Sequence, residues 1–395
     1  MEEGWWRGPG LDALIAAVSA LERGSWALLH ALGLAPLVHG QPAWPFGARV
    51  SVAMLTLDPS HARRVGMVML LLAAAVLAGL LAALLRWPLR SRKASAVALG
   101  LGAALLAGAA WTWPAPELLW APAVPTSFHR LPDAVAGEAA LHGGRLYAQH
   151  CAACHGANGD GDGPQAEGGP RWPPTLNRGL LWRRSDGELF WHLRHGMADG
   201  QGQPTMPALP HELPDDAAWA LLAWLQLHAA GQQLARAGEW QLPLAAPALD
   251  VRCDGAAPRE LQALRGQRLR IVALRPDQPA LREDPRFQTV TLSPAPRAQA
   301  EGCEAVSEAA WQAYALVAGV APDALAGTEF LVDRDGWLRA RRKADDAPWS
   351  DAMLVCRGSG AASGAMADAG ADGLERLLAR MDAEPVRPVR GGRLH

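Results

Sequence analysis

The chain has 395 residues and a formal net charge of −2 at pH 7. At about 100–200 residues per domain, this length predicts two or three domains. The near-neutral charge, without a basic cluster interleaved with aromatics, argues against a nucleic-acid-binding protein. Half of the residues are hydrophobic, and they are concentrated in the first third of the chain, which indicates a membrane region.

Residues 1–113 are the predicted membrane region. Residues 66–85 are uncharged and almost wholly apolar, about the length that a helix needs to cross a bilayer, and a second such run covers 94–113. The alternative is two buried helices of a soluble core. An excess of positive charge places a connecting loop on the cytoplasmic side, and this loop carries Arg86, Arg90, Arg92 and Lys93. Everything after Trp113 is then expected on the periplasmic side of a bacterial cytoplasmic membrane.

The apolar stretch from Leu11 to Val38 is interrupted by Glu22 and Arg23. Its uncharged part from Ser25 onward is too short to span a bilayer and suits an interfacial or re-entrant segment. If the charged pair lies inside a packed helix, there are three spans instead of two. The stretch and its flank also carry two histidines that are either copper or haem ligands or interfacial residues: His30 and His39.

The compartment is indicated by the N-terminus and the cysteines. The start Met1-Glu2-Glu3 is acidic where a signal peptide is positive, so export requires an internal apolar span. Of the five cysteines, two belong to one short motif. The other three lie far apart, and one pair could form a disulfide in an oxidising compartment, leaving a free thiol. Their spacing leaves the pair open: Cys253, Cys303 and Cys356.

Three further regions follow the membrane part. Residues 114–132 are rich in Pro and Ala and predict a stiff linker. An all-α domain is predicted over 133–232, and a second linker over 233–246. The helices expected in the all-α domain are Val135–His150, Asp186–His195 with Ser185 as its N-cap, and Asp215–Ala230.

Residues 247–383 have a different pattern and predict an α/β domain with the order β-β-α-β-β-α. An Asp335-Gly336 turn predicts a hairpin between Phe330–Val332 and Trp337–Ala340. The Ala/Gly/Ser-rich stretch 358–373 predicts a flexible loop, and residues 384–395 a disordered tail. The other expected elements are strands at Arg270–Leu274 and Thr289–Leu292 and helices at Ser307–Val320 and Gly373–Met381.

The run Cys151-Ala152-Ala153-Cys154-His155 carries the strongest chemical signal. Thiols at i and i+3 of a helix face the same way and can add to the two vinyl groups of one haem, with the adjacent histidine under the iron. Zinc would need a second ligand pair, and a thioredoxin-type CxxC would follow a strand rather than a helix. We therefore expect one covalent haem c, with His155 as an iron ligand.

Met206 is the predicted sixth ligand. It lies between prolines in Pro204-Thr205-Met206-Pro207, which fix the backbone ahead of the third helix. Histidine and methionine together leave no open position for oxygen, which suits electron transfer. The competitors are Met197, His192 and His195, and the remaining reading is that Met206 only packs.

Residues 133–232 resemble a class I cytochrome c, on the haem motif, the loop Gly156–Gly163, the Met-Pro loop and the terminal helices. The resemblance implies that Gly144 and Trp224 lie where those helices cross. Asp186–Trp191 and His195-Gly196 resemble a subgroup fused behind a CopD-type copper-resistance membrane region, and Ala43–Arg49 resembles the end of that region. Copper transport is not implied, because only its last helices are present.

Residues 247–383 resemble a thioredoxin-like or peroxiredoxin-like domain, on the hairpin sequence Gly327–Arg339. The resemblance implies active cysteines after the first core strand, near Arg275–Leu281, and this segment has none. Thiol–disulfide exchange needs a reactive thiolate, so we expect this domain to be catalytically inert.

The expected protein is a multidomain, membrane-anchored c-type cytochrome that transfers single electrons in a periplasmic or respiratory redox chain. It is an electron-transfer protein rather than an enzyme, with redox proteins and the membrane as its partners. The alternatives are a haem subunit that serves copper handling or thiol redox chemistry, and a docking subunit of a larger oxidoreductase complex.

Overall fold

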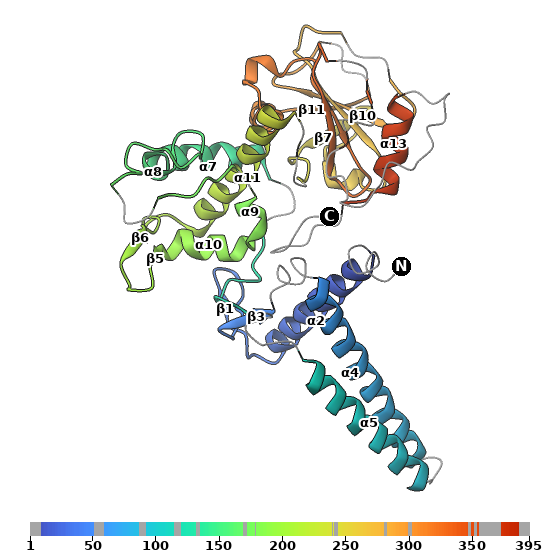
Figure 1. The fold of residues 1–395 in the computed structure, drawn as a ribbon. Helices are drawn as coiled ribbons and strands as arrows, with labels where there is room; N and C mark the ends of the chain where they lie inside the picture. The colour runs from blue at the N-terminus through green and yellow to red at the C-terminus, as the bar shows by residue number, and fades with distance from the viewer. Residues whose placement is uncertain are drawn as a thin grey trace. The chain divides into compact units, whose positions relative to one another are not determined.

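The computed structural model describes residues 9–50, 59–86, 92–113, 120–131, 135–168, 172–177, 179–238, 240, 244–279, 283–298, 302–346, 349–350, 354 and 373–386. Arg90, Cys356 and most of the expected flexible loop and tail lie outside these ranges. The chain divides into two compact units (Figure 1). The first comprises Met1–Leu37, Trp44–Pro125 and Gly391–Arg393, and the second Val38–Ala43, Thr126–Arg390 and Leu394–His395.

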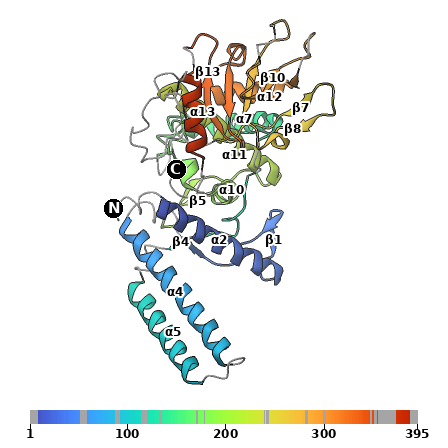
Figure 2. The same ribbon diagram turned by 90° about the vertical axis from the view of Figure 1, so that its right-hand side faces the viewer.

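The first unit contains α2 (Pro9–Ala31), α4 (Pro59–Arg86) and α5 (Arg92–Thr112). In both ribbon views α4 and α5 lie side by side (Figures 1 and 2). Small residues line their contact, where the Ser95 hydroxyl donates to the Ala82 carbonyl at 3.0 Å. Close packing through small residues is typical of helices that associate in a bilayer.

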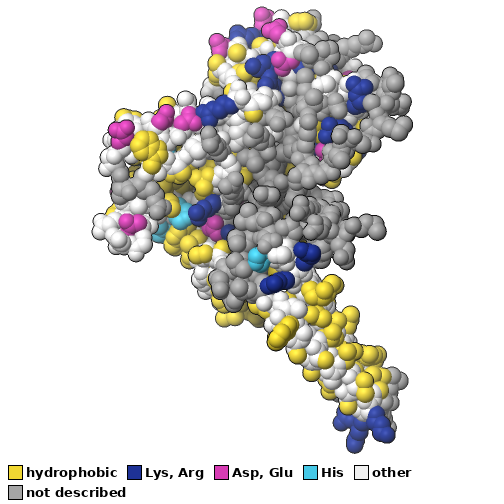
Figure 3. Space-filling model, in the orientation of Figure 1, with side chains coloured by type: hydrophobic (Ala, Val, Ile, Leu, Met, Phe, Trp, Pro, Cys, Tyr) yellow, Lys and Arg dark blue, Asp and Glu magenta, His cyan; other side chains and the backbone are white. Residues whose placement is uncertain are grey.

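Within the described residues, two helices are long and apolar enough to cross a membrane, Ser60–Arg86 and Arg92–Thr112. These agree with the predicted spans at 66–85 and 94–113. Large apolar side chains on their outer faces are exposed, such as Leu77 at 66% and Val97 at 73%. In Figure 3 this pair of helices is covered mainly by hydrophobic side chains, with Lys and Arg at its far end.

Helix α2 continues through Glu22 and Arg23 and ends at Ala31. The Glu22 carboxylate accepts a hydrogen bond from the backbone N–H of Val50 at 2.9 Å, so this charge has a partner within the same unit. The charged pair therefore lies inside a continuous helix, and α2 is not among the described helices that are long and apolar enough to cross a membrane.

The described part of the expected linker 114–132 is packed. The strand β4 (Trp120–Pro122) pairs antiparallel with β3 (Ala48–Val50). Farther along, the buried Thr126 hydroxyl donates to the Gly187 carbonyl at 2.6 Å. The prediction of a stiff free tether is therefore corrected, because polar groups of this segment bond to neighbouring elements.

Two short paired strands, β1 (Leu37–Val38) and β2 (Gln41–Pro42), stand at the start of the second unit. Leu37, the first residue of β1, still belongs to the first unit. The predicted helices follow close to their expected bounds. Ser185 caps its helix as predicted, because its side chain accepts from the Glu188 N–H. The elements are α7 (Gly137–His150), α8 (Ala152–His155), α9 (Leu180–Arg183), α10 (Asp186–His195), β5 (Met197–Ala198), β6 (Pro204–Met206) and α11 (Asp215–Ala237).

Helices α7 and α11 cross at very short range. A methyl group placed on Gly143 would lie 2.1 Å from the Ala220 carbonyl oxygen, and one on Gly144 would lie 2.8 Å from Trp224 Nε1. Only glycine therefore permits this approach. The predicted crossing of the terminal helices at Gly144 and Trp224 is confirmed.

The rest of the second unit contains a seven-stranded sheet in the order β13-β12-β9-β10-β11-β7-β8. Strands β9, β10 and β11 are parallel, and β12 is antiparallel to β9. The predicted β-β-α-β-β-α order is present as β9, β10, α12, β12, β13 and α13, with β7, β8 and β11 added. The bounds are β7 (Asp250–Cys253), β8 (Arg259–Glu260), β9 (Leu269–Ala273), β10 (Gln288–Ser293), β11 (Cys303–Val306), α12 (Glu308–Ala318), β12 (Glu329–Val332), β13 (Leu338–Arg342) and α13 (Gly373–Ala383), with 3₁₀ turns at Leu261–Leu264 and Pro322–Ala324.

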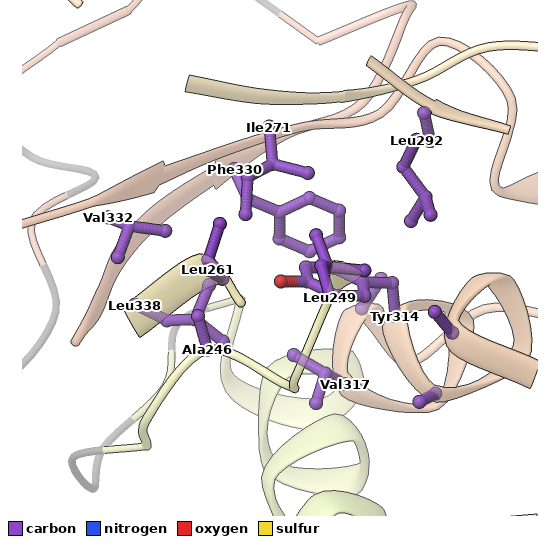
Figure 4. Packing of buried hydrophobic residues seen from close by; sticks show 14 of the residues in the cluster. Ala246, Leu249, Leu261, Ile271, Leu292, Tyr314, Val317, Phe330, Val332 and Leu338 are labelled. Atoms are coloured by element: carbon purple, nitrogen blue, oxygen red, sulfur yellow. The ribbon is translucent and has the colours of Figure 1, made fainter. Parts of the chain in front are cut away.

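A helix packs on each face of this sheet. On one face Tyr314 and Val317 of α12 meet Ile271, Leu292 and Phe330 (Figure 4). On the other face the buried side chains come from α13 and the two strands beside it: Leu377, Leu378, Met381, Leu331 and Ala340. The sheet is thus covered by apolar side chains on both faces, as parallel strands require.

The all-α part and the sheet share one hydrophobic core. Leu227 and Leu234 of α11 belong to the same buried cluster as Tyr314 and Phe330. A methyl group on Gly231 would lie 1.9 Å from the Leu316 carbonyl oxygen of α12. The expected linker 233–246 is corrected accordingly: α11 runs on to Ala237, and the 1%-exposed Trp240 donates its indole N–H to the Val317 carbonyl at 3.0 Å.

Cys253 and Cys303 form a disulfide. They lie opposite each other on the antiparallel strands β7 and β11, with a Cα–Cα distance of 3.9 Å. The structure thus assigns a disulfide that the sequence left open. The pairing depends on the addition of β7 beside β11, which the sequence did not indicate.

Candidate haem site

The haem motif lies directly after α7. Cys151 ends this helix, with its N–H bonded to the Tyr147 carbonyl at 2.9 Å, and α8 then carries the motif to His155. The His155 N–H bonds back to the Cys151 carbonyl at 2.8 Å. The five residues thus form one tight helical turn, which is the local geometry that the motif requires.

The ring of His155 is oriented by a backbone carbonyl. Its Nδ1 lies 3.3 Å from the Pro174 oxygen. Because a carbonyl only accepts, Nδ1 must carry the proton, and Nε2 holds the lone pair. Burial lowers the pKa of His155, although the bond to Pro174 opposes this shift. A neutral imidazole with a free Nε2 lone pair is the form that binds iron.

The Cys151 thiol is unlike a reactive thiol of a redox CxxC pair. Burial, with a contribution from Cys154, raises the pKa of Cys151 to about 12. Reactive disulfide-exchange cysteines have lowered pKa values. Cys151 and Cys154 are both free cysteines, and Cys154 Sγ contacts Gln165 Oε1 at 4.0 Å. Two unpaired thiols beside a neutral imidazole are the groups that covalent attachment of a haem c requires, so Cys151, Cys154 and His155 fit this cofactor.

Aromatic side chains pack together in the all-α part that carries the motif. The Tyr147 hydroxyl donates to the Gly156 carbonyl at 2.6 Å, and its ring lies 4.5 Å from that of Trp224. Phe190, which is fully buried, stacks on Trp219 at 4.4 Å. These rings make the centre of the all-α part apolar, and a low-dielectric surrounding strengthens the electrostatic control of a redox group.

Met206 and its competitor Met197 lie on one hairpin. They are direct partners on the antiparallel strands β5 and β6, so their side chains point to the same side of the pair. Met206 is partly buried, whereas Met197 is 38% exposed. The structure thus brings both candidates together, and the sixth ligand stays a prediction that the deeper burial of Met206 favours.

The histidines considered as ligands have other contacts. His195 Nδ1 lies 3.1 Å from the Trp191 carbonyl, and the two rings stack at 3.6 Å. His39 Nδ1 lies 2.8 Å from the Asp215 carboxylate. His30 Nδ1 lies 3.2 Å from the Ala35 carbonyl. For His192 the observation is electrostatic: burial lowers the pKa of its imidazole.

No group of three or more His, Cys, Asp or Glu side chains within the described ranges is placed to hold a metal ion.

Sequence reasoning missed two groups near the motif. The first is the Pro174 carbonyl, which orients His155. The second is a set of buried polar side chains that hold the same loop, of which Asn177 is 2% exposed and His228 is 9% exposed. The only signal in the sequence was the Pro173-Pro174 pair, which indicates a fixed backbone.

Comparison with known proteins finds one matching family model. A family model described as cytochrome C oxidase, cbb3-type, subunit III, matches residues 138–225. This match supports a c-type cytochrome domain.

The remaining comparisons are sparse. None of the curated proteins matches the chain. Among solved structures, a chain of the Kuenenia stuttgartiensis reducing HAO-like protein complex is similar, with 22% identity and a TM-score of 0.21. The similarity covers 35% of this chain and 61% of that chain, so this chain spans less than two thirds of that structure.

Proposed function

We propose that the chain is a membrane-anchored c-type cytochrome that transfers single electrons on the periplasmic side of a bacterial cytoplasmic membrane. The observation that carries the proposal is the motif Cys151–His155, with Nδ1 of its histidine bonded to the Pro174 carbonyl. Within the matched family domain, this arrangement leaves Nε2 for iron and two thiols for covalent attachment.

The residues act by holding and enclosing a haem. When bound, haem c supplies a one-electron redox centre. Cys151 and Cys154 would attach it as thioethers, and His155 Nε2 and the Met206 thioether would be its iron ligands. With two protein ligands to iron, the site would exchange electrons rather than bind a substrate there.

The membrane and compartment parts of the proposal have separate support. The helices α4 and α5 have the length and exposed apolar surface of spans, and positive residues lie at their connected ends, Arg86, Arg92 and Lys93. The Cys253–Cys303 disulfide is typical of an oxidising compartment. We propose two spans, with the haem and the sheet on the outer side.

The sheet is proposed to be a thioredoxin-like domain that docks a redox partner. Its parallel strands β9 and β10, its β12–β13 hairpin and its two helices support this assignment. The described residues after β9, 274–279, contain no cysteine, so no nucleophile follows that strand. The fusion to a copper-resistance membrane region also stays a proposal.

A thiol redox role is the second candidate, and one observation favours it. The guanidinium of Arg259 lies 3.7 Å from the partly exposed Cys253 sulfur of the disulfide. A neighbouring cation stabilises a thiolate. Thiol counting on the purified protein before and after mild reduction separates the candidates, because a pure electron carrier keeps this disulfide intact.

The main test replaces the proposed sixth ligand in the detergent-purified protein. Met206→Ala should remove the near-infrared sulfur–iron band of the oxidised protein, while the covalently attached haem persists in a denaturing gel. Met197→Ala is the matched control and should keep the band. A band that survives in Met206→Ala and vanishes in Met197→Ala would reassign the ligand, and wild-type protein without covalent haem would refute the function.

A further inference from the structure

The loop that orients His155 is itself held by α11. Two chain segments meet there: residues 158–160, shortly after the haem motif, and residues 174–177, which begin with the Pro174 carbonyl. They are joined by the Leu176 N–H, which bonds to the Gly159 carbonyl at 2.7 Å. Asn177 adds a second link, because its side-chain amide donates to the Asn158 carbonyl and, at 3.1 Å, to Asp160.

Helix α11 binds both segments through its polar side chains. His228 Nε2 donates to the Asn158 carbonyl at 3.1 Å, with its ring stacked 4.5 Å from Trp224. Gln233 donates to the Asn177 carbonyl at 3.2 Å. Farther along, Arg236 forms two bonds of 2.8 Å with the Asp160 carboxylate.

Three side chains of this network are buried, and a partly exposed ion pair completes it. The side chains of Asn177, His228 and Gln233 are less than a tenth exposed. A hydrogen bond made there competes little with water and is costly to lose. Burial alone raises the pKa of Asp160, but hydrogen bonds from Arg236 and Asn177 hold it below its ordinary value, so the carboxylate stays charged.

The same helix is fixed on another side by the sheet domain. Gly231 approaches the Leu316 carbonyl so closely that a methyl group would lie 1.9 Å from it, and Leu227 and Leu234 lie in the shared core. The polar network therefore rests on a helix that cannot shift without disturbing that core.

We propose that Asn177, His228 and Arg236 are positioning residues for the iron ligand. They hold residues 158–160 and 174–177 on α11, and this keeps the Pro174 carbonyl within hydrogen-bonding distance of His155 Nδ1. This inference rests on the proposed function, because it takes Nε2 of His155 as an iron ligand. Partners of this kind raise the basicity of a metal-bound histidine, and their loss typically changes metal affinity 10–100-fold.

The test compares His228→Leu, His228→Gln and Arg236→Gln in the full, detergent-purified, haem-loaded chain. Losing the His228 donor should loosen the Pro174 bond, weaken electron donation from His155 and favour the reduced state. We expect about a tenfold higher ratio of reduced to oxidised protein at fixed potential in His228→Leu, equivalent to about 59 mV for one electron. The low-spin ferric resonance spectrum should change with it.

The other variants separate positioning from general stability. Glutamine at position 228 can still donate to Asn158, so His228→Gln should return most of the way to the wild-type potential, and Arg236→Gln should shift it in the same direction by less. His142→Leu, at an exposed position of α7, is the matched control and should leave the potential unchanged. If His228→Leu does not fold, His228→Gln and Arg236→Gln carry the comparison.

The outcomes distinguish the two proposals. Wild-type protein without covalent haem refutes the proposed function. Haem-loaded variants whose potentials and ferric spectra equal those of His142→Leu refute the positioning role alone.

Discussion

Tyr147 links the helix before the haem motif to the loop after it. Its hydroxyl donates to the Gly156 carbonyl at 2.6 Å, while its ring, 2% exposed, lies against Trp224. The Tyr147 ring therefore packs in the core, while its hydroxyl binds the backbone at the end of α8. Single hydrogen bonds from residues outside Cys151–His155, such as those of Tyr147 and Pro174, thus hold the motif and its flank.

We expect Tyr147→Phe to lower the free energy of unfolding by about 1–3 kcal/mol, because a buried carbonyl loses its donor while the ring packing is kept. Urea unfolding followed by far-ultraviolet circular dichroism measures this. The haem spectrum should stay of the c type, since no ligand changes. A variant as stable as wild type would mean that water replaces the hydroxyl.

At the scale of elements, two glycine contacts decide how the helices pack. Gly143 sets the α7–α11 crossing beside the motif, and Gly231 sets the α11–α12 contact with the sheet domain. Helix α11 thus contacts the first helix of the cytochrome domain and the sheet domain through different residues. The position of α11 therefore affects both the placement of residues 158–160 and 174–177 and the packing of the shared core.

Gly143→Ala should destabilise the fold by about 1–3 kcal/mol, because the added methyl group overlaps the Ala220 carbonyl. The matched control is Gly24→Ala in α2, where a methyl group meets nothing within 4 Å. Alanine should there be neutral or stabilising by up to about 1 kcal/mol. Thermal unfolding of both variants provides the comparison, and equal melting temperatures would argue against the close crossing.

The disulfide also fixes how two elements pack, because it joins β7 to β11. Cys253 and Cys303 are separated by 50 residues, and closing a loop of that length stabilises a fold by about 4 kcal/mol through the entropy of the unfolded chain. The double variant Cys253→Ser/Cys303→Ser should lose stability of this order while haem attachment at Cys151 and Cys154 persists. Urea midpoints measure the loss, and an unchanged midpoint would show that β7 is held by its other contacts.

At the scale of the whole molecule, the cytochrome part and the sheet form one compact unit. Leu227 and Leu234 of α11 are at most 4% exposed because the sheet domain covers them. Fully exposing such a side chain costs about 1.5–3 kcal/mol. The two parts therefore depend on each other for stability, although only one of them carries the haem motif.

A chain ending at residue 238 should accordingly show a large loss of stability and of haem-loaded yield. A chain ending at residue 386 retains every described element and is the control. Haem content per protein and melting temperature, measured for both after detergent purification, test the expectation. Equal stability of the two chains would mean that the cytochrome domain folds alone.

Local features of this protein could be predicted from the sequence alone. The haem motif follows from the fixed spacing that a porphyrin requires, and the two apolar helices follow from the length that a bilayer requires. The cap at Ser185, the crossing at Gly144 and Trp224, and the β-β-α-β-β-α order were also predicted, because each depends on neighbouring residues or on a recognised family pattern.

Contacts between distant parts of the chain could not be predicted in this way and follow from the fold. The Pro174 carbonyl on His155, the support from His228 and Arg236, the Cys253–Cys303 pair and the shared core all join segments that are far apart in the chain. Linkers predicted from Pro and Ala content proved to be packed where they are described, because composition does not show whether a segment has partners. His155 of the CxxCH motif is oriented by the Pro174 carbonyl, a contact that periodicity and spacing did not identify.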